Sequence, residues 1–342
     1  MTEASSTPGI DLGRVTDWLC GVLPRLEPPL EFALIAGGRS NLTYRFVDRS
    51  GAAWVLRRPP LGHVLESAHD VGREHRIVSA LQGSSVPVPP VVGLCADTEV
   101  IGAPFYVMGF VEGRVLHDAS AAAELPVSDR QRLGGEAVDV LARLHRTDPE
   151  AVGLGDLGRK EAYLARQLRR WGKQWEATRT HEIPDMEESA CLLSERMPEQ
   201  AGATIVHGDF RLGNTIVAGG TIRALLDWEL CTLGDPLADL GYLLNSWPDP
   251  GEPGAESSPS GAGGFRPRSF LIERYAETTG RDVSRIDYYR AFQHWRLAAI
   301  GQGVYKRYVV GVMAKDDAFD VEQYRLSVVR QAGAALKLLR RL

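Results

Sequence analysis

Residues 207–214 read His-Gly-Asp-Phe-Arg-Leu-Gly-Asn and follow an apolar run at 204–206. Farther along, the runs 215–218 and 221–226 flank a Gly-Gly pair, which is the two-residue turn typical of a β-hairpin. Such a hairpin carries the chain back to the place from which it started. We therefore expect residues 207–214 and the end of the hairpin to form one site.

Three oxygen-bearing side chains would meet there, namely Asp209, Asn214 and, at the end of the hairpin, Asp227. Phosphoryl transfer needs such a set, because its transition state is mainly charge to be held and positioned. Asp209 would orient an attacking hydroxyl and take its proton. Asp227 and the amide oxygen of Asn214 would bind Mg²⁺. Arg211 could reach the migrating phosphoryl group.

Simpler interpretations of the same residues exist. Asp209 and Asn214 are also common turn-formers, and Asp227 could cap a strand. The spacing and the hairpin together favour the site. For His207, a structural, hydrogen-bonded histidine is favoured over a role in proton transfer, because it follows a buried strand and precedes a glycine.

Composition limits the classes of function. The chain has 342 residues, enough for two lobes, and a net charge of -5, which argues against nucleic acid as the main partner. The four scattered cysteines lack CxxC pairing and predict a reducing, cytoplasmic environment without a zinc site. The N-terminus lacks a signal pattern and no apolar run is long enough to span a membrane. These cysteines are Cys20, Cys95, Cys191 and Cys231.

The first third of the chain reads as strands around a short loop. Strands are expected at 31–35 and 42–47, joined by a loop that contains Gly38, Ser40 and Asn41. Backbone N–H groups of such a loop can cover phosphates, although a glycine-containing hairpin is more often only a turn. The loop lacks a full GxGxxG or Walker pattern.

The next strand, 53–58, places Val55 and Arg57 on one face by its period of two. A helix is expected over 67–81, with Glu74 on its inward-facing side. A buried carboxylate needs a cationic partner, and Arg57 is the natural one. Alternatively, Glu74 is solvated and pairs with a neighbour on its own helix.

A nearly continuous apolar strand at 105–111 marks the expected boundary between the lobes: 1–108 as the first lobe, 109–113 as a hinge and 114–342 as the second. The Gly-, Pro- and Ser-rich residues 248–264 are expected to be a flexible loop, either a lid or a solvated insertion. Helical spacing or capping indicates further helices at 11–23, 128–147, 161–179, 185–197, after Asp235, at 287–312 and at 320–342.

One face of the 287–312 helix carries Trp295, Ala299, Gln302 and Lys306, and Arg296 lies on the neighbouring face. Such a wall would suit an acyl or anionic substrate, with snorkelling surface charges as the equal alternative. Asp239 sits among leucines and is expected to be a buried carboxylate bonded to backbone N–H groups of the 207–214 turn.

Together these residues resemble a known family. The chain, from Ala33 to about Tyr308, resembles the aminoglycoside phosphotransferase and choline kinase group of protein-kinase-like enzymes. Within that group it is most similar to the kinase-like N-terminal domain fused to certain large acyl-CoA dehydrogenases. The resemblance is strongest in HGDFRLGN (207–214), LLDWE (225–229) and GDPLADLGY (234–242).

The resemblance implies an α+β fold with two lobes: a small N-lobe with an antiparallel sheet and a helix, and a larger, mainly helical C-lobe. It implies Asp209 as the catalytic aspartate, assisted by Arg211, and Asn214 and Asp227 as Mg²⁺ ligands. It implies a structural role for Asp239 and makes Glu74 the acidic partner in the ion pair of the N-lobe. The expected nucleotide-binding residues are Gly38, Ser40, Asn41, Val55, Arg57, Glu74, Met108, Gly109 and Val111, the main chain of Gly109 and Val111 meeting the adenine.

The chain also departs from the family pattern. Arg57 and Arg58 stand where many kinases have a lysine, and a guanidinium can clamp phosphates bidentately but is no equivalent of an ammonium. The sequence leaves open which arginine faces inward. Gly208 replaces the arginine that reads activation-loop phosphorylation in many protein kinases, so no such switch is expected.

The expected function is transfer of the γ-phosphoryl group of ATP, with Mg²⁺, to a hydroxyl of a small molecule. A hydroxyacyl-CoA or hydroxy acid is the acceptor that the resemblance suggests, and an aminoglycoside or amino alcohol is the alternative. An aminoglycoside would want clustered carboxylates, of which the C-terminal part offers Asp316, Asp317, Asp320 and Glu322. A protein kinase is disfavoured by the short segment after Asp227, and a catalytically silent nucleotide-binding regulatory module remains. The choice of ATP or GTP and of monomer or homodimer stays open.

Overall fold

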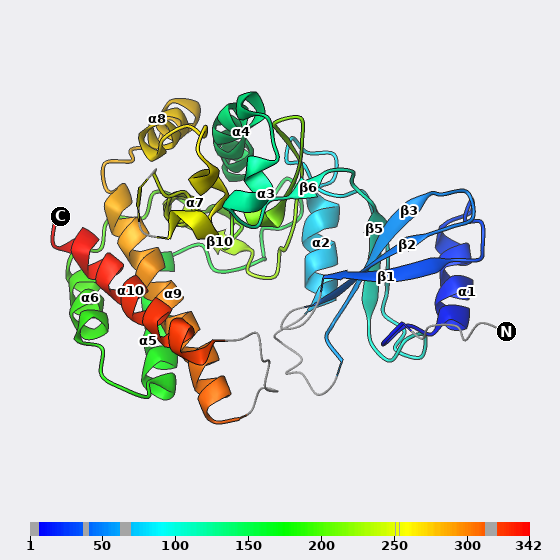
Figure 1. Ribbon diagram of the computed structural model, residues 1–342, viewed down its shortest axis with the longest axis horizontal. Coiled ribbons are helices and arrows are strands. Elements are labelled where there is room, and N and C mark those ends of the chain that lie inside the picture. Colours follow the sequence, from blue (N-terminus) through cyan, green and yellow to red (C-terminus); the bar gives the residue numbers. More distant parts are fainter. Residues whose placement is uncertain (1–6, 37–40, 62–69, 250, 253, 312–319) are drawn as a thin grey trace. The chain divides into compact units, whose positions relative to one another are not determined.

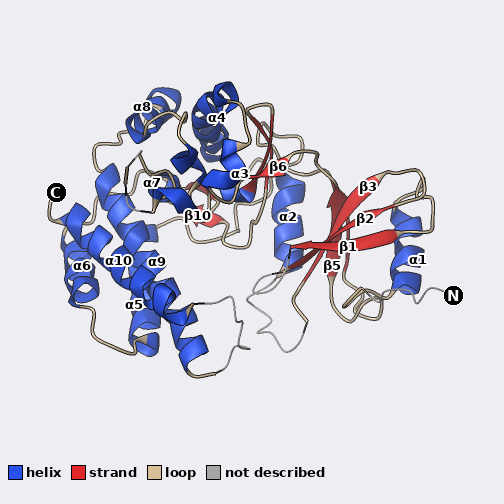
Figure 2. Ribbon diagram, viewed as in Figure 1, coloured by secondary structure: helices blue, strands red, loops and turns tan. Residues whose placement is uncertain are grey.

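The computed structural model describes residues 7–36, 41–61, 70–249, 251–252, 254–311 and 320–342. The chain divides into two compact units, Met1–Val115 with Asn214–Leu230, and Leu116–Gly213 with Cys231–Leu342. The α+β fold is confirmed, since the first unit is built on an antiparallel sheet and the second is mainly helical (Figure 2). The boundaries 1–108, 109–113 and 114–342 stay a prediction; by contacts, Asn214–Leu230 groups with the first unit.

The first unit contains a five-stranded antiparallel sheet with the order β1-β2-β3-β5-β4 (Figure 1). Two helices cover it, and side chains alternate between its two faces. Val15 and Leu19 of α1 pack with Leu56, and Val71 of α2 packs with Val55. The elements are α1 (Leu12–Val22), β1 (Glu31–Ala36), β2 (Leu42–Val47), β3 (Ala53–Arg58), α2 (Val71–Leu81), β4 (Val91–Cys95) and β5 (Phe105–Gly109).

Helix ends in this unit follow from capping side chains. Asp11 caps α1 by accepting from the Arg14 N–H, as expected. Asp70 caps α2 in the same way, so this helix begins at Val71 rather than at residue 67; residues 62–69 lie outside the described part. The apolar strand predicted at 105–111 ends at Gly109.

The predicted hairpin is confirmed. Strands β8 (Thr215–Ala218) and β9 (Thr221–Leu225) pair in antiparallel fashion, and β6 (Arg114–Val115) adds a third strand. Gly219 and Gly220 have φ values of 58° and 71°, which a two-residue hairpin turn requires of both central residues. The Leu226 N–H donates to the Asn214 carbonyl at 2.8 Å, so the end of the hairpin is bonded to its start.

The second unit consists of helices around a two-stranded ladder of β7 and β10. Helix α9 packs against α5, α6, α7 and α10 (Figure 1). The elements are α3 (Ala119–Ala123), α4 (Val127–Arg146), α5 (Tyr163–Thr178), α6 (Pro184–Glu195), β7 (Thr204–Val206), β10 (Thr232–Gly234), α7 (Pro236–Asn245), α8 (Arg268–Thr279), α9 (Ile286–Val309) and α10 (Val321–Leu339), with 3₁₀ helices at Leu212–Asn214, Ala255–Ser257 and Pro259–Ala262.

The expected substrate wall on α9 is an internal packing face instead. The Trp295 indole donates to the Met186 carbonyl at 3.1 Å and is 2% exposed. The side chains of Gln302 and Lys306 donate to carbonyls of Thr178 and Ala177, the last residues of α5. Carbonyls at a helix end have no partner within the helix. The side chains of Gln302 and Lys306 therefore bond to the end of α5 and are not available to a substrate.

Arginines contact the Gly-, Pro- and Ser-rich residues 248–264, whose expected flexibility stays a prediction. Arg268 forms ion pairs with Asp249 and Glu252, and Arg130 donates to the carbonyls of Ala262 and Gly263. Two of the 3₁₀ helices lie in this stretch. Residues 250 and 253 lie outside the described part.

Candidate functional site

The residues predicted from the sequence fall into two groups, one in each unit. In the first unit, the Arg57 side chain leaves β3 on the face that α2 covers and meets Glu74, a residue of the first turn of α2. Its Nε lies 2.7 Å from Glu74 Oε2 and its Nη2 lies 3.0 Å from Oε1. This bidentate geometry is the strong form of an arginine–carboxylate pair. The predicted ion pair is therefore confirmed.

Burial governs the electrostatics of this pair. Glu74 is 2% exposed, and burial raises the pKa of its carboxyl group, while Arg57 opposes the rise. Burial by itself would lower the pKa of Arg57, but Glu74 and the neighbouring acidic groups outweigh it and raise that pKa. The Tyr106 hydroxyl also approaches Glu74 Oε2, at 3.5 Å, and burial raises the pKa of this tyrosine.

The position of Arg58 shows which of the two arginines of β3 faces α2, a question that the sequence left open. It points to the opposite face of the sheet, is 4% exposed and donates to the carbonyls of Gly9 and Ile101. Burial lowers the pKa of Arg58. Arg57, with Glu74, is therefore the arginine of the predicted site.

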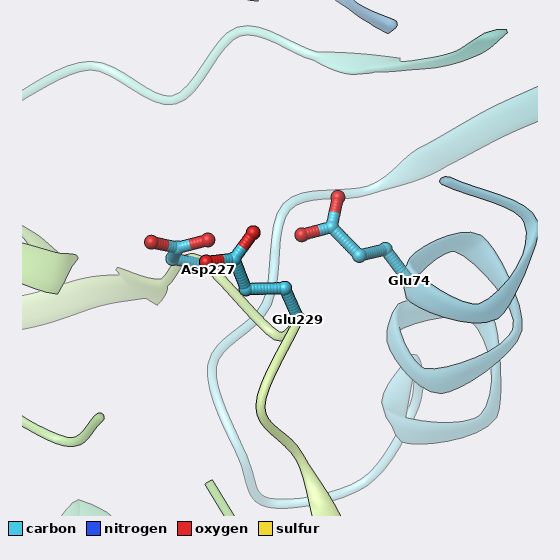
Figure 3. Close-up of side chains that lie close together, drawn as sticks. All are labelled: Glu74, Asp227 and Glu229. Carbon is cyan, nitrogen blue, oxygen red and sulfur yellow. The ribbon is translucent and has the colours of Figure 1, made fainter. Parts of the chain in front are cut away.

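Asp227 completes this group. Its Oδ1 accepts a hydrogen bond from Arg57 Nη2 at 2.8 Å, so one guanidinium joins Asp227 to Glu74. Glu229 lies beside them, and one oxygen from each of the three carboxylates falls within 4.8 Å of the others (Figure 3). Such hard oxygen donors suit a divalent cation. Sequence reasoning missed Glu229, although a second acid two residues after Asp227 was a visible signal.

Asp227 has an uncommon backbone conformation, with φ at 65°. Asp and Asn tolerate this left-handed region better than other residues with a side chain. The conformation holds the carboxylate at the turn that follows β9.

The remaining expected nucleotide contacts in the first unit have mixed outcomes. Val55 and Met108 are neighbours across β3 and β5 and share a buried cluster. The Gly109 N–H donates to the Pro90 carbonyl at 2.7 Å, so this donor is used inside the unit. Asn41 is buried and its amide donates to Glu74 at 3.4 Å. Val111 follows the end of β5, and Gly38 and Ser40 lie outside the described residues.

In the second unit, the Asp239 carboxylate holds the start of the 207–214 stretch by accepting hydrogen bonds from its backbone N–H groups. Asp239 Oδ2 accepts from the His207 N–H at 2.6 Å and Oδ1 accepts from the Gly208 N–H at 2.8 Å. His145 Nε2 lies 3.4 Å from Oδ2, and burial lowers the pKa of this histidine. The predicted structural role of Asp239 is confirmed.

His207 is buried, and its Nδ1 accepts from the Asp209 N–H at 3.2 Å, which confirms the structural interpretation of this histidine. Arg211 Nε lies 3.5 Å from Asp209 Oδ1. Burial, and then the Asp209 carboxylate, raise the pKa of Tyr242 of α7. Sequence reasoning quoted Tyr242 in a motif but gave it no role.

Comparisons with known proteins agree with this arrangement. The model of the phosphotransferase enzyme family matches residues 31–271. Acyl-CoA dehydrogenase family member 10 of Mus musculus is 39% identical over 298 residues, which are 83% of this chain. The match covers only 27% of that relative's length.

Among solved structures, a protein of Ralstonia eutropha JMP134, provisionally assigned as an aminoglycoside phosphotransferase, is 31% identical with a TM-score of 0.81. That match covers 97% of this chain and 98% of the other. A thermostable mutant of aminoglycoside phosphotransferase APH(4)-Ia, in complex with AMP-PNP and hygromycin B, shares the fold at 16% identity, with a TM-score of 0.62 over 95% and 98% of the two chains. None of the described helices is long and apolar enough to span a membrane.

Proposed function

Because the chain belongs to the phosphotransferase enzyme family, whose fold is that of small-molecule kinases, we propose that it transfers the γ-phosphoryl group of ATP to a hydroxyl of a small molecule, with Mg²⁺. The acceptor is a hydroxyacyl-CoA or a related hydroxy acid. The reaction takes place in the cytoplasm.

The observation that carries the proposal is the guanidinium of Arg57, fixed by Glu74 and bonded at the same time to Asp227. A fixed guanidinium beside a carboxylate offers a phosphate clamp next to a metal ligand. Arg57 would exchange Asp227 for the nucleotide phosphates, and Met108, Val55, Gly109 and Val111 would enclose the base.

The donor set fits Mg²⁺. Asn214 and Asp227 would hold the ion, with Glu229 as a further oxygen donor in the same group of carboxylates. The ion would neutralise charge that develops on the transferred phosphoryl group. The protein's own contribution is to fix these oxygens, since Asn214 and the residue before Asp227 are bonded through their backbones.

Asp209 would orient the acceptor hydroxyl and accept its proton, and Arg211 would stabilise the charge of the migrating phosphoryl group. The loop supports this assignment. Its first two N–H groups are held by Asp239, and the Asp209 carboxylate lies near Arg211.

The acceptor class rests on the relatives. The chain matches part of a protein named for acyl-CoA dehydrogenation, so a phosphorylated acyl-CoA is a reasonable product of this part. An aminoglycoside or amino alcohol is the second candidate, since a structural neighbour binds hygromycin B. The described acids near the C-terminus weigh against it. Asp320 caps α10 and Glu322 pairs with Arg325, whereas Asp316 and Asp317 lie outside the described residues.

The test is transfer of γ-phosphate from Mg-ATP to separate pools of hydroxyacyl-CoAs, hydroxy acids, amino alcohols and aminoglycosides, read by mass. We expect a phosphorylated product in the first or second pool. Asp209→Ala and Asp227→Asn should abolish it. Asparagine is the right replacement at position 227, because it tolerates the left-handed backbone there.

Product only in the aminoglycoside or amino-alcohol pool would refute the acceptor class and leave the kinase. Binding of Mg-ATP without turnover in any pool would favour a catalytically silent regulatory module. Absence of nucleotide binding would refute the whole proposal.

A further inference from the structure

Gly208, the residue before Asp209, is held at both ends of its backbone. Its N–H donates to Asp239, and its carbonyl accepts from both terminal nitrogens of Arg296 on α9, each at 3.1 Å. Its φ of 85° lies in the region that glycine adopts without strain. Because Asp209 follows directly, these three hydrogen bonds to Gly208 determine where the Asp209 side chain begins.

Arg296 is itself fixed from several sides. It is 5% exposed, and Nη1 also donates to Gln293 Oε1 at 2.9 Å. The Gln293 amide in turn donates to the Ala238 carbonyl of α7 at 2.7 Å. The guanidinium carbon lies 5.6 Å from the centre of the Trp171 ring and 5.9 Å from that of Tyr242. Rings at this distance stabilise a buried cation.

The charge of Arg296 has an unusual environment. In the described part of the chain it takes part in none of the ion pairs, whereas Arg290 on the same helix pairs with Asp287. Burying a cation without a carboxylate costs desolvation free energy. The Gly208 carbonyl, the Gln293 side chain and two aromatic rings offset this cost. Both terminal nitrogens of the Arg296 guanidinium therefore point at the 207–214 loop.

Tyr242, one turn after Asp239 in α7, is a second neighbour of the same guanidinium. Its ring faces Arg296, and burial, and then the Asp209 carboxylate, raise the pKa of its hydroxyl. The peptide that precedes Asp209 is thus held by Arg296, which is held in turn by Gln293 and the two rings.

We infer that Arg296 is a positioning residue of the phosphoryl transfer: it fixes the Gly208 peptide and thereby the place from which the Asp209 carboxylate meets the acceptor hydroxyl. The inference rests on the proposed function. Loss of this contact should lower kcat and leave Mg-ATP binding intact, because the proposed nucleotide-binding residues belong to the other unit. Small misplacements of a reacting group can cost about 100-fold in rate.

The test uses Arg296→Ala and Arg296→Lys, with Arg290→Ala as the matched control on the same helix. Steady-state kinetics give kcat and KM for Mg-ATP, and amide hydrogen exchange reports on residues 207–213. We expect Arg296→Ala to lower kcat about 100-fold, with KM within about twofold and faster exchange in the loop. Arg290→Ala should change neither kcat nor loop exchange.

Chemical rescue separates positioning from packing. Guanidinium chloride at about 20 mM, far below denaturing concentrations, should enter the space left in Arg296→Ala and restore kcat at least about tenfold, by analogy with the lost side chain. It should have no such effect on Arg290→Ala. Unchanged kcat in Arg296→Ala, or a loss that guanidinium does not restore, would overturn the inference.

If Arg296→Ala does not fold, Arg296→Lys decides the question, because it keeps the charge and loses the bidentate contact. It should lower kcat about tenfold with faster exchange at 207–213, and wild-type behaviour would count against the inference. If the wild-type protein transfers phosphate to no acceptor, the proposed function is wrong. Loop exchange in the variants then still shows whether Arg296 holds Gly208.

Discussion

Asp227 and Asp209, the two carboxylates assigned to the reaction, are held by different kinds of bond. Asp227 is bonded to another side chain, the guanidinium of Arg57, which also binds Glu74. Asp209 stands on a loop whose backbone groups are bonded to Asp239 and Arg296. A side-chain ion pair can exchange partners when a metal and phosphates arrive, whereas a bonded peptide cannot move without breaking several contacts. The difference suits a ligand-binding group in one case and a proton acceptor of fixed position in the other.

The largest expected effect is on the loop side. Asp239→Asn should lower the free energy of unfolding by about 3 kcal/mol, because an amide keeps one acceptor and turns its NH₂ group toward a buried N–H donor. Urea unfolding at neutral pH measures this change. Asp282→Asn, an exposed aspartate of the same unit, should leave the unfolding midpoint unchanged. If Asp239→Asn lowered the free energy of unfolding no more than Arg57→Lys, described below, the two regions would not differ in the way proposed.

Acid should affect the two regions in opposite directions. His294 lies on α9, two residues before Arg296; burial, with help from Arg290 and Arg268, lowers its pKa to about 4. Below its ordinary value of about 6.5 the unfolded chain binds the proton more readily, so stability falls as the pH drops from about 6.5 toward 4, by about 3 kcal/mol. Burial raises the pKa of Glu74, so the folded state takes up that proton first and this group adds stability as the pH falls toward about 4.5.

Urea unfolding between about pH 7 and pH 5 measures both contributions. His294→Gln should flatten the loss of stability in acid, and the glutamine retains a polar group beside Gln331. Glu74→Gln should make the loss steeper. A slope that neither variant changes would show that other groups govern the acid response.

The smallest expected effect is on the side-chain pair. Arg57→Lys should lower the free energy of unfolding by about 1 kcal/mol, since an ammonium keeps the charge near Glu74 but loses the fork that also reaches Asp227. Mg-ATP titration should show weaker binding for the same reason. Arg45→Lys on the adjacent strand β2 is the control, because Arg45 contacts the Phe110 ring and neither carboxylate of the pair in the described structure. An equal loss of binding in both variants would contradict the assigned role of Arg57.

The sequence predicts those parts of this arrangement that depend on local spacing. The two-residue period of β3 and the position of Glu74 favoured the ion pair, although the sequence left open whether Arg57 or Arg58 faces inward, and the Gly-Gly turn was enough to predict the hairpin. Asp239 was recognisable because an acid among leucines needs buried donors.

Long-range contacts were not predictable in this way. Arg296 lies 88 residues from the carbonyl that it binds, and helical spacing shows which residues share a face but not what covers it. For that reason the sequence offered a substrate wall or snorkelling surface charges for the face of α9 with Trp295, and neither alternative included α5 and α6, which cover it. The hydrogen bonds and ion pairs that Arg130 and Arg268 make with residues 249–263 were not predictable either, because the composition of this stretch is typical of flexible loops.

The first unit is discontinuous in the sequence, because Asn214–Leu230 joins it after 98 intervening residues, 116–213, of the second unit. During synthesis the chain therefore emerges in an order that differs from the order of assembly. The sheet of β1–β5 can form early, but β6 gains its partner strand only after residues 215–218 have left the ribosome, and Arg57 gains its contact with Asp227 only after residue 227 has left it. Contacts of this sequence separation slow folding. A fragment limited to residues 1–115 would lack the strand and the carboxylate that complete the unit, so the site is the last part of the first unit to be made.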